Sequence, residues 1–188
     1  MGVQEPKEIK KHVCMGILAH VDGGKTTFSE QLLYHAGVIR TAGRVDQKNT
    51  VMDGDEVEKA IYADQSWFEY EGDEYCLLDT PGHVDFSAET ERAVTALDYA
   101  ILLADASSGV AAHTVTLFRM LDRFQIPVFI FINKTDLETA NTEETMKEIK
   151  DRLTENAVFV EKWPPDKQDL DALTEFTAER DEEIMEDY

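Results

Sequence analysis

Apolar runs and amphipathic stretches alternate along the chain, which predicts strands separated by helices. The runs read as strands are short, apolar or alternating, and bounded by polar residues or glycine. They are 12–18, 65–70, 74–78, 99–105 and 127–133. The stretches with helical spacing are 26–36, 86–97, 110–124 and 142–153. The two strands on either side of Gly72 predict a hairpin at a sheet edge, and the run 127–133 predicts a buried strand.

Strands joined by helices of this length predict a mostly parallel sheet with helices on both faces, a three-layer α/β fold. In the first helix, Phe28, Leu32 and Leu33 are expected to face inward, with Gly37 as the stop. The segment 163–166 contains two prolines and predicts a linker or a turn. Beyond it, 170–188 predicts an acidic amphipathic helix. We therefore expect a body at 1–155 and an acidic helical extension at 156–188.

The net charge of the chain argues against two classes of binding partner. The 188 residues carry a net charge of −21, and 17 acidic and six basic residues lie between positions 138 and 188. This charge argues against a broad basic surface for nucleic acid and against adsorption to anionic membranes. Cys14 and Cys76 each lie in an apolar run and predict buried, reduced thiols, while the N-terminus has no apolar signal core. We expect a cytoplasmic monomer that binds neither DNA nor a membrane.

The first chemical motif follows the first strand and reads AHVDGGKTT. Small residues let successive backbone N–H groups surround a phosphate, and the helix that begins here favours anions at its start. Lys25 adds a positive charge for the outer phosphates, and the Thr26 hydroxyl is placed to bind Mg²⁺. The residues expected to contact the nucleotide phosphates are Ala19, His20, Val21, Asp22, Gly23, Gly24, Lys25, Thr26 and Thr27.

The second motif, DTPGH, follows the strand 74–78. Asp79 can hold Mg²⁺ through a water, and Gly82 can offer its N–H to a terminal phosphate because no Cβ blocks the approach. His83 then points its ring at the space beside that phosphate. After a phosphate loop, this motif predicts the metal-holding and γ-phosphate-sensing element of a nucleotidase.

The third motif, NKTD, follows the strand 127–133. The Asp136 carboxylate can accept two hydrogen bonds from a base with adjacent N–H and NH₂ groups, which guanine has and adenine lacks. Asn133 is expected to brace the loop, and Lys134 to lay its stem over the base. The three motifs in this order predict binding of GTP or GDP with Mg²⁺.

The segments GILAHVDGGKTT, LLDTPGHVDFSAE and FINKTD together resemble the GTPase domain of translational GTPases. These include elongation factor G, the tetracycline-resistance ribosomal protection proteins and the GTPase that recycles release factors. The resemblance is good over about 9–155 and weaker afterwards. It implies a ribosome partner, a catalytic role for His83 in orienting the attacking water or stabilising charge around it, and a role for Val21 as an apolar gate.

Two departures from the family pattern leave the activity open. The Arg-Gly-Ile-Thr element, whose Thr would bind Mg²⁺, is missing between Ala60 and Ile61. Either the chain has a true deletion there, or a loop is missing from the sequence; we expect the second, with a break at Ala60 and another near 160–164. The chain also ends before the family's Ser-Ala element, so we expect the last strand and helix to be absent. The alternatives to a GTPase are a nucleotide-binding module without useful hydrolysis and an acidic interaction protein. Which translation step the protein serves is also open.

Overall fold

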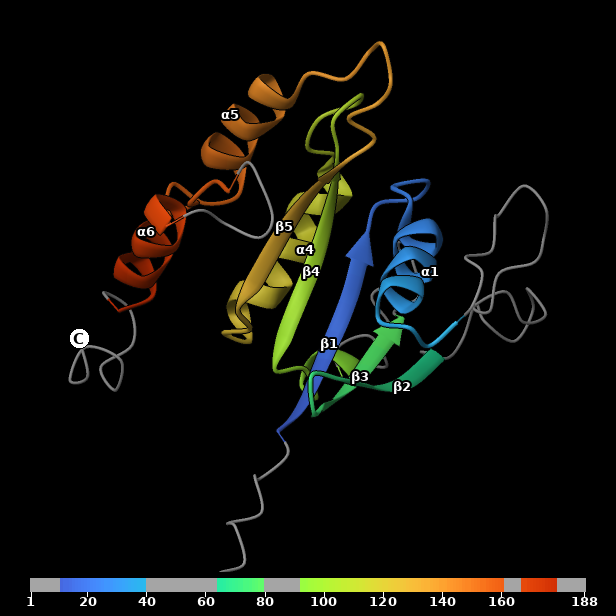
Figure 1. The fold of residues 1–188 in the computed structure, drawn as a ribbon. Coiled ribbons are helices and arrows are strands. Elements are labelled where there is room, and N and C mark those ends of the chain that lie inside the picture. Colours follow the sequence, from blue (N-terminus) through green and yellow to red (C-terminus); the bar gives the residue numbers. More distant parts are fainter. Residues whose placement is uncertain (1–10, 40–63, 80–91, 161–166, 179–188) are drawn as a thin grey trace, which may run out of the picture. The chain divides into compact units, whose positions relative to one another are not determined.

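The computed structural model describes residues 11–39, 64–79, 92–160 and 167–178 (Figure 1). The chain divides into two compact units, 1–148 and 149–188, which are described separately below. The gap expected at Ala60 and Ile61, the second one near 160–164 and the linker at 163–166 lie outside the described residues. The boundary expected between 155 and 156 stays a prediction.

The first unit contains a mixed sheet that, in the described part of the chain, has five strands in the order β2-β3-β1-β4-β5. The strands are β1 (His12–Ala19), β2 (Asp64–Tyr70), β3 (Asp73–Asp79), β4 (Tyr99–Asp105) and β5 (Val128–Asn133). All neighbours pair in parallel except β2, which pairs with β3 as an antiparallel hairpin. The carboxyl ends of β1, β3, β4 and β5 therefore lie at one edge of the sheet.

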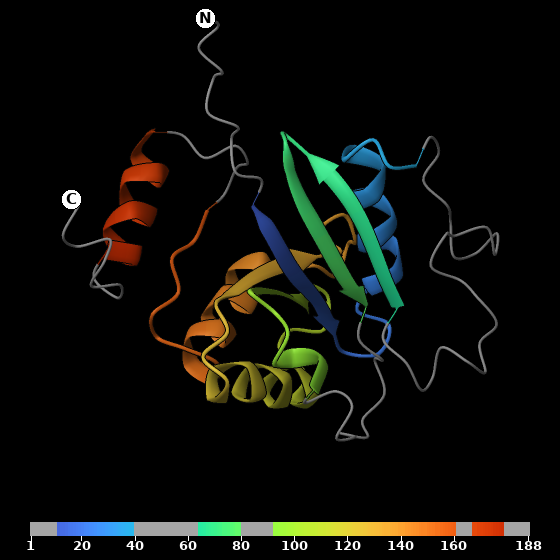
Figure 2. The ribbon, with the colours of Figure 1, turned by 90° about the horizontal axis from the view of Figure 1, so that it is seen from below.

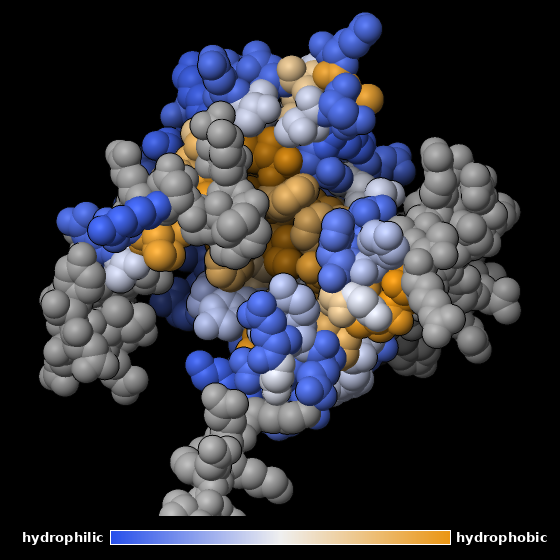
Figure 3. Space-filling view, in the orientation of Figure 1, coloured by the Kyte–Doolittle hydropathy of each residue, from blue (hydrophilic) through white to orange (hydrophobic). Residues whose placement is uncertain are grey.

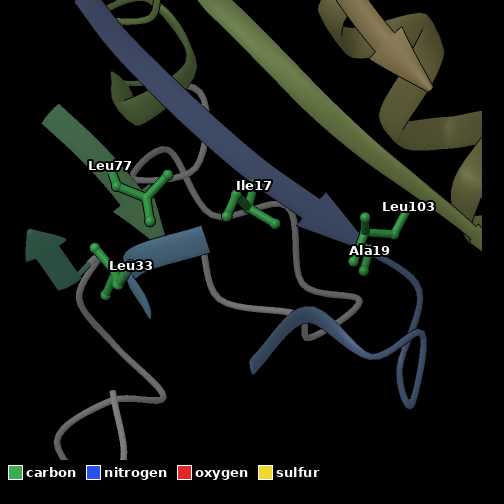
Figure 4. Packing of buried hydrophobic residues seen from close by; sticks show 5 residues of the cluster. All are labelled: Ile17, Ala19, Leu33, Leu77 and Leu103. Carbon is green, nitrogen blue, oxygen red and sulfur yellow. The ribbon is translucent and has the colours of Figure 1, made fainter. Parts of the chain in front are cut away.

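Helices α1 (Lys25–His35) and α4 (Ala112–Arg123) lie on opposite faces of this sheet (Figure 2). Leu33 of α1 packs onto Ile17 and Leu77, and these side chains form a buried cluster with Ala19 and Leu103 (Figure 4). Leu117 and Leu121 of α4 are also buried. The three-layer α/β fold predicted from the alternating pattern is confirmed.

The prediction of a buried strand at 127–133 is wrong, because every residue of β5 is exposed or only partly buried. The side chains of Phe129 and Phe131 are 60% and 46% exposed. Strand β5 is the last of the described strands, and the ring of Phe131 lies 4.8 Å from the ring of Phe28 in α1. Figure 3 shows apolar side chains exposed on this face of the sheet.

The two thiols lie opposite each other on neighbouring strands. Cys14 of β1 pairs in register with Cys76 of β3, and both are free, as predicted. Cys76 is buried, whereas Cys14 is only partly buried. Burial, followed by the neighbouring Cys76, raises the pKa of Cys14 to about 12. The Cys14 thiol is therefore neutral at physiological pH.

The helix expected at 142–153 is confirmed to within one residue as α5 (Thr142–Arg152), whereas the helices expected at 86–97 and 170–188 are described only in part. Helix α5 spans the boundary between the units and begins after Asn141, whose side chain accepts a hydrogen bond from the N–H of Glu144. In the second unit, α6 (Lys167–Ala178) covers the first part of the helix expected at 170–188; the rest lies outside the described residues. Of the helix expected at 86–97, only 92–94 is described as helical. No helix in the described ranges is both long and apolar enough to cross a membrane.

Candidate nucleotide site

The loop between β1 and α1 has the backbone shape of an anion site. Asp22 and Gly24 both have positive φ, 60° and 87°, while the N–H of Gly23 donates to the His20 carbonyl at 2.9 Å. Left-handed residues placed this way turn successive N–H groups toward one side of a loop. Gly24 directly precedes Lys25, the first residue of α1, so the positive end of the helix dipole adds to the attraction.

Both glycines are required by the space around them. A Cβ on Gly23 would lie 2.8 Å from the His20 carbonyl oxygen and 3.1 Å from the Ala19 Cβ. A Cβ on Gly24 would collide with the side-chain amide nitrogen of Asn133. Any residue larger than glycine at either position would therefore force the loop out of this backbone path.

Asn133 joins this loop to the third motif. Its side-chain amide donates to the Gly23 carbonyl at 3.0 Å, across 110 positions of sequence. Its own carbonyl accepts a hydrogen bond from the N–H of Ala106, just after β4. The structure thus brings the first and third motifs side by side at the carboxyl edge of the sheet.

Lys134 makes an ion pair that the sequence reasoning missed. Its Nζ lies 2.7 Å from Oδ2 of Asp105, the last residue of β4, and the other oxygen of that carboxylate accepts hydrogen bonds from Ser107. Burial would raise the pKa of Asp105, but the hydrogen bonds from Lys134 and Ser107 outweigh it and lower the pKa to about 2. An Asp-x-Ser sequence at the end of a parallel strand, typical of a side-chain turn, was the available signal.

This shift predicts how stability depends on pH. Because the folded pKa of Asp105 is below its ordinary value of 3.8, its charge stabilises the fold above the unfolded pKa. That contribution is lost as the pH falls toward about 2. The free energy of unfolding of the wild type minus that of Asp105→Asn should be constant above about pH 5 and shrink below it. Urea unfolding of both proteins across this range measures the difference, and a flat difference would contradict the assignment.

The other predicted residues are distributed as follows. Thr26 is half-buried in the first turn of α1, Thr27 is exposed, and Val21 and Asp136 are exposed in their loops. Asp79 ends β3, which pairs in register with β1, so it reaches the same sheet edge as the phosphate loop. Gly82 and His83 lie outside the described residues.

The donor set of this edge fits Mg²⁺ in its chemistry. Thr26 brings a hydroxyl oxygen to this edge, and the backbone of β3 brings an aspartate, Asp79, to it. Mg²⁺ prefers oxygen ligands and binds through one or two protein groups plus phosphates and water. His20 lies beside His113 of α4, with ring centroids 6.0 Å apart. Burial, then the charge of His20, lowers the pKa of His113. A neutral His113 adds no charge to the loop.

Comparison with known proteins agrees with this geometry. The family described as "Elongation factor Tu GTP binding domain" matches residues 10–184, well past the point where the resemblance of the motifs weakens. "Ribosome-releasing factor 2, mitochondrial" of Danio rerio is 40% identical over 158 residues, covering 82% of this chain and 21% of that protein. "Tetracycline resistance protein TetP" of Clostridium perfringens is 41% identical over 154 residues, covering 80% and 24%.

A solved structure shares the fold. The crystal structure of a Thermus thermophilus protein, ttk003000868, matches with a TM-score of 0.66 and 26% identity, covering 74% of this chain and 22% of that one. The chain thus spans about a fifth to a quarter of the length of these relatives. Because the family match covers nearly the whole sequence, this chain belongs to the elongation factor Tu-type GTP-binding domains of the translational GTPases.

Proposed function

We propose that this GTP-binding domain hydrolyses GTP to GDP and phosphate as part of a ribosome-associated translation factor. The observation that carries the proposal is the hydrogen bond from Asn133 to the Gly23 carbonyl. It joins the loop shaped for phosphates to the segment expected to select guanine. A single nucleotide can then contact both, with its phosphates at α1 and its base beyond β5.

Each motif has one task in this proposal. The loop amides and Lys25 bind the phosphates, and Thr26 and Asp79 hold Mg²⁺, which neutralises charge on the phosphate oxygens when bound. The N–H of Gly82 contacts the γ-phosphate. His83 orients the attacking water or stabilises the charge that develops around it, and Val21 limits the access of other water. Asn133, Lys134 and Asp136 select guanine.

The partner follows from the relatives. Among them are proteins named as a ribosome-releasing factor, elongation factor G and peptide chain release factor 3. We infer that this chain acts at the ribosome as a cytoplasmic monomer. Docking there depends on the remaining four fifths or so of a relative's length, which the chain does not span. Whether the whole protein translocates, recycles factors or protects against tetracycline depends on the same parts.

A binding module without useful hydrolysis is the second candidate. It is favoured by the absence of the Arg-Gly-Ile-Thr element, which the family pattern would place between the adjacent residues Ala60 and Ile61. Without the Thr of this element, Mg²⁺ would have one protein ligand fewer, and no loop would close over the γ-phosphate. Such a module would bind GDP and GTP with similar affinity, because nothing in it would distinguish the γ-phosphate.

Single-turnover hydrolysis separates the two candidates. GTP is bound to the chain with Mg²⁺, and phosphate release is measured with and without ribosomes. A GTPase releases phosphate faster than the buffer control, and His83→Ala slows that release several-fold while GDP affinity stays within a few fold. His12→Ala is the control, because His12 is exposed at the start of β1, at the opposite end of that strand from the phosphate loop. Loss of GDP binding in His83→Ala would show that His83 is structural.

A further inference from the structure

The carboxylate of Asp105 is shared between two residues in a way that leaves little freedom. Its Oδ1 accepts hydrogen bonds from the N–H of Ser107 at 2.8 Å and from the Ser107 hydroxyl at 2.6 Å. Its Oδ2 accepts from Nζ of Lys134 at 2.7 Å. Ser107 therefore fixes the plane of the carboxylate, and the carboxylate fixes the end of the lysine side chain.

The backbone around Asp105 is fixed as well. The N–H of Gly109 donates to the Asp105 carbonyl at 2.8 Å, and the N–H of Ala106 donates to the Asn133 carbonyl at 2.9 Å. The Ala106 carbonyl in turn accepts from the N–H of Asn141 at 2.8 Å. The two bonds made by Ala106 tie the end of β4 to the loop that follows β5. The separation between the backbones of Asp105 and Lys134 is thus set by hydrogen bonds at the end of the sheet.

Lys134 needs such an anchor. A lysine has a compact charge on a flexible four-carbon stem, and a stem that is free to rotate loses conformational entropy when a ligand fixes it. Lys134 has a positive φ of 59°, which is unfavourable for a lysine, and its carbonyl accepts a hydrogen bond from the N–H of Leu137 at 3.3 Å, which supports this backbone conformation. With both ends fixed, the apolar stem forms a ready surface between backbone and ammonium group.

We propose that Asp105, held by Ser107, is a positioning residue that presets the Lys134 stem for the base of a guanine nucleotide. This inference rests on the proposed function, because it assumes that Lys134 contacts the nucleotide. Asp105 acts through Lys134 and does not itself touch the ligand. The competing explanation is that the ion pair only stabilises the fold.

A double-mutant cycle on nucleotide affinity distinguishes the two explanations. GDP affinity is measured by calorimetry for the wild type, Asp105→Asn, Lys134→Met and the double variant. In the wild-type background, Asp105→Asn should weaken GDP binding about tenfold, a coupling within the range that residues in contact show. In the Lys134→Met background, the same change should alter affinity less than about twofold. Ser107→Ala should give a smaller loss of the same kind.

Asp98→Asn is the matched control. Asp98 lies just before β4, at the opposite end from Asp105, and its carboxylate accepts a hydrogen bond from the N–H of Cys14 at 2.7 Å. Its loss should lower the melting temperature of the free protein and leave GDP affinity unchanged. Equal losses for Asp105→Asn in both backgrounds, or no loss in either, would overturn the positioning role. A wild-type chain that binds GDP no better than ADP would overturn the proposed function itself. If Asp105→Asn does not fold, Ser107→Ala replaces it in the cycle.

Discussion

Replacing Asp136 by asparagine is expected to weaken GTP binding by roughly 1.5–3 kcal/mol, or about 10- to 150-fold. Guanine offers an N–H and an NH₂ side by side, and a carboxylate accepts from both, whereas an asparagine side chain accepts only one of the two and places an NH₂ against the other donor. Asp136 is exposed, so its replacement should leave the free energy of unfolding nearly unchanged. Calorimetric titration of both proteins with GTP measures the loss.

Xanthosine triphosphate tests whether the loss comes from the base. Its 2-oxo group can accept from the new asparagine, so its affinity should fall less than that of GTP, or rise. Glu138→Gln is the control, because it removes an exposed negative charge two positions away from Asp136 and has no expected role at the base. Equal losses for both nucleotides would show that Asp136 does not read the base.

Gly24→Ala is expected to weaken GDP and GTP binding about 100-fold or more, because two or more charge-assisted hydrogen bonds from the loop amides lose their alignment. The new Cβ collides with the Asn133 amide, so the hydrogen bond from Asn133 to Gly23 breaks or the loop moves. An L-residue at the Gly24 φ of 87° also costs about 1–2 kcal/mol of stability. Nucleotide titration and thermal unfolding of the free protein separate these two effects.

Gly37→Ala provides the comparison for this change. Gly37 has a similar positive φ of 73°, but a Cβ there would have nothing within 4 Å. This variant should therefore show the backbone cost of about 1–2 kcal/mol without a loss of nucleotide affinity. If Gly24→Ala binds GDP as well as Gly37→Ala does, the contact between Asn133 and the loop has no part in binding.

Local sequence signals were sufficient for most of the fold. The apolar runs predicted β1, β4 and β5 within one residue at each end, and Gly72 marked the turn of the hairpin, where Glu71 and Gly72 both have positive φ. The error at β5 has a physical cause. An apolar run indicates that a strand can be buried, but whether it is buried depends on which other elements pack against it. The exposure of Phe129 and Phe131 could therefore not be predicted from the sequence of the strand alone.

The parts of the candidate site that could be predicted are those whose residues form one short, continuous sequence motif. The phosphate loop and the NKTD segment each carry their own spacing, and the structure places them together through Asn133 and Gly23. Asp105 was missed because its importance depends on a lysine 29 positions away, just after the next strand of the sheet. Such a pair becomes visible only when the register of β4 and β5 is known, which sets Asp105 opposite Asn133.

The two free thiols that face each other across β1 and β3 make it possible to measure how often this part of the sheet opens. Cys76 is buried, and the raised pKa of Cys14 keeps it in the unreactive neutral form. A thiol reagent can therefore modify Cys76 only in molecules in which the structure has opened around β3, and separation of β1 from β3 is one such opening. Because the loop proposed to bind phosphate follows β1 and Asp79 ends β3, that separation would move the two parts of the proposed site away from each other. The rate of modification thus sets an upper limit on how often β1 and β3 separate.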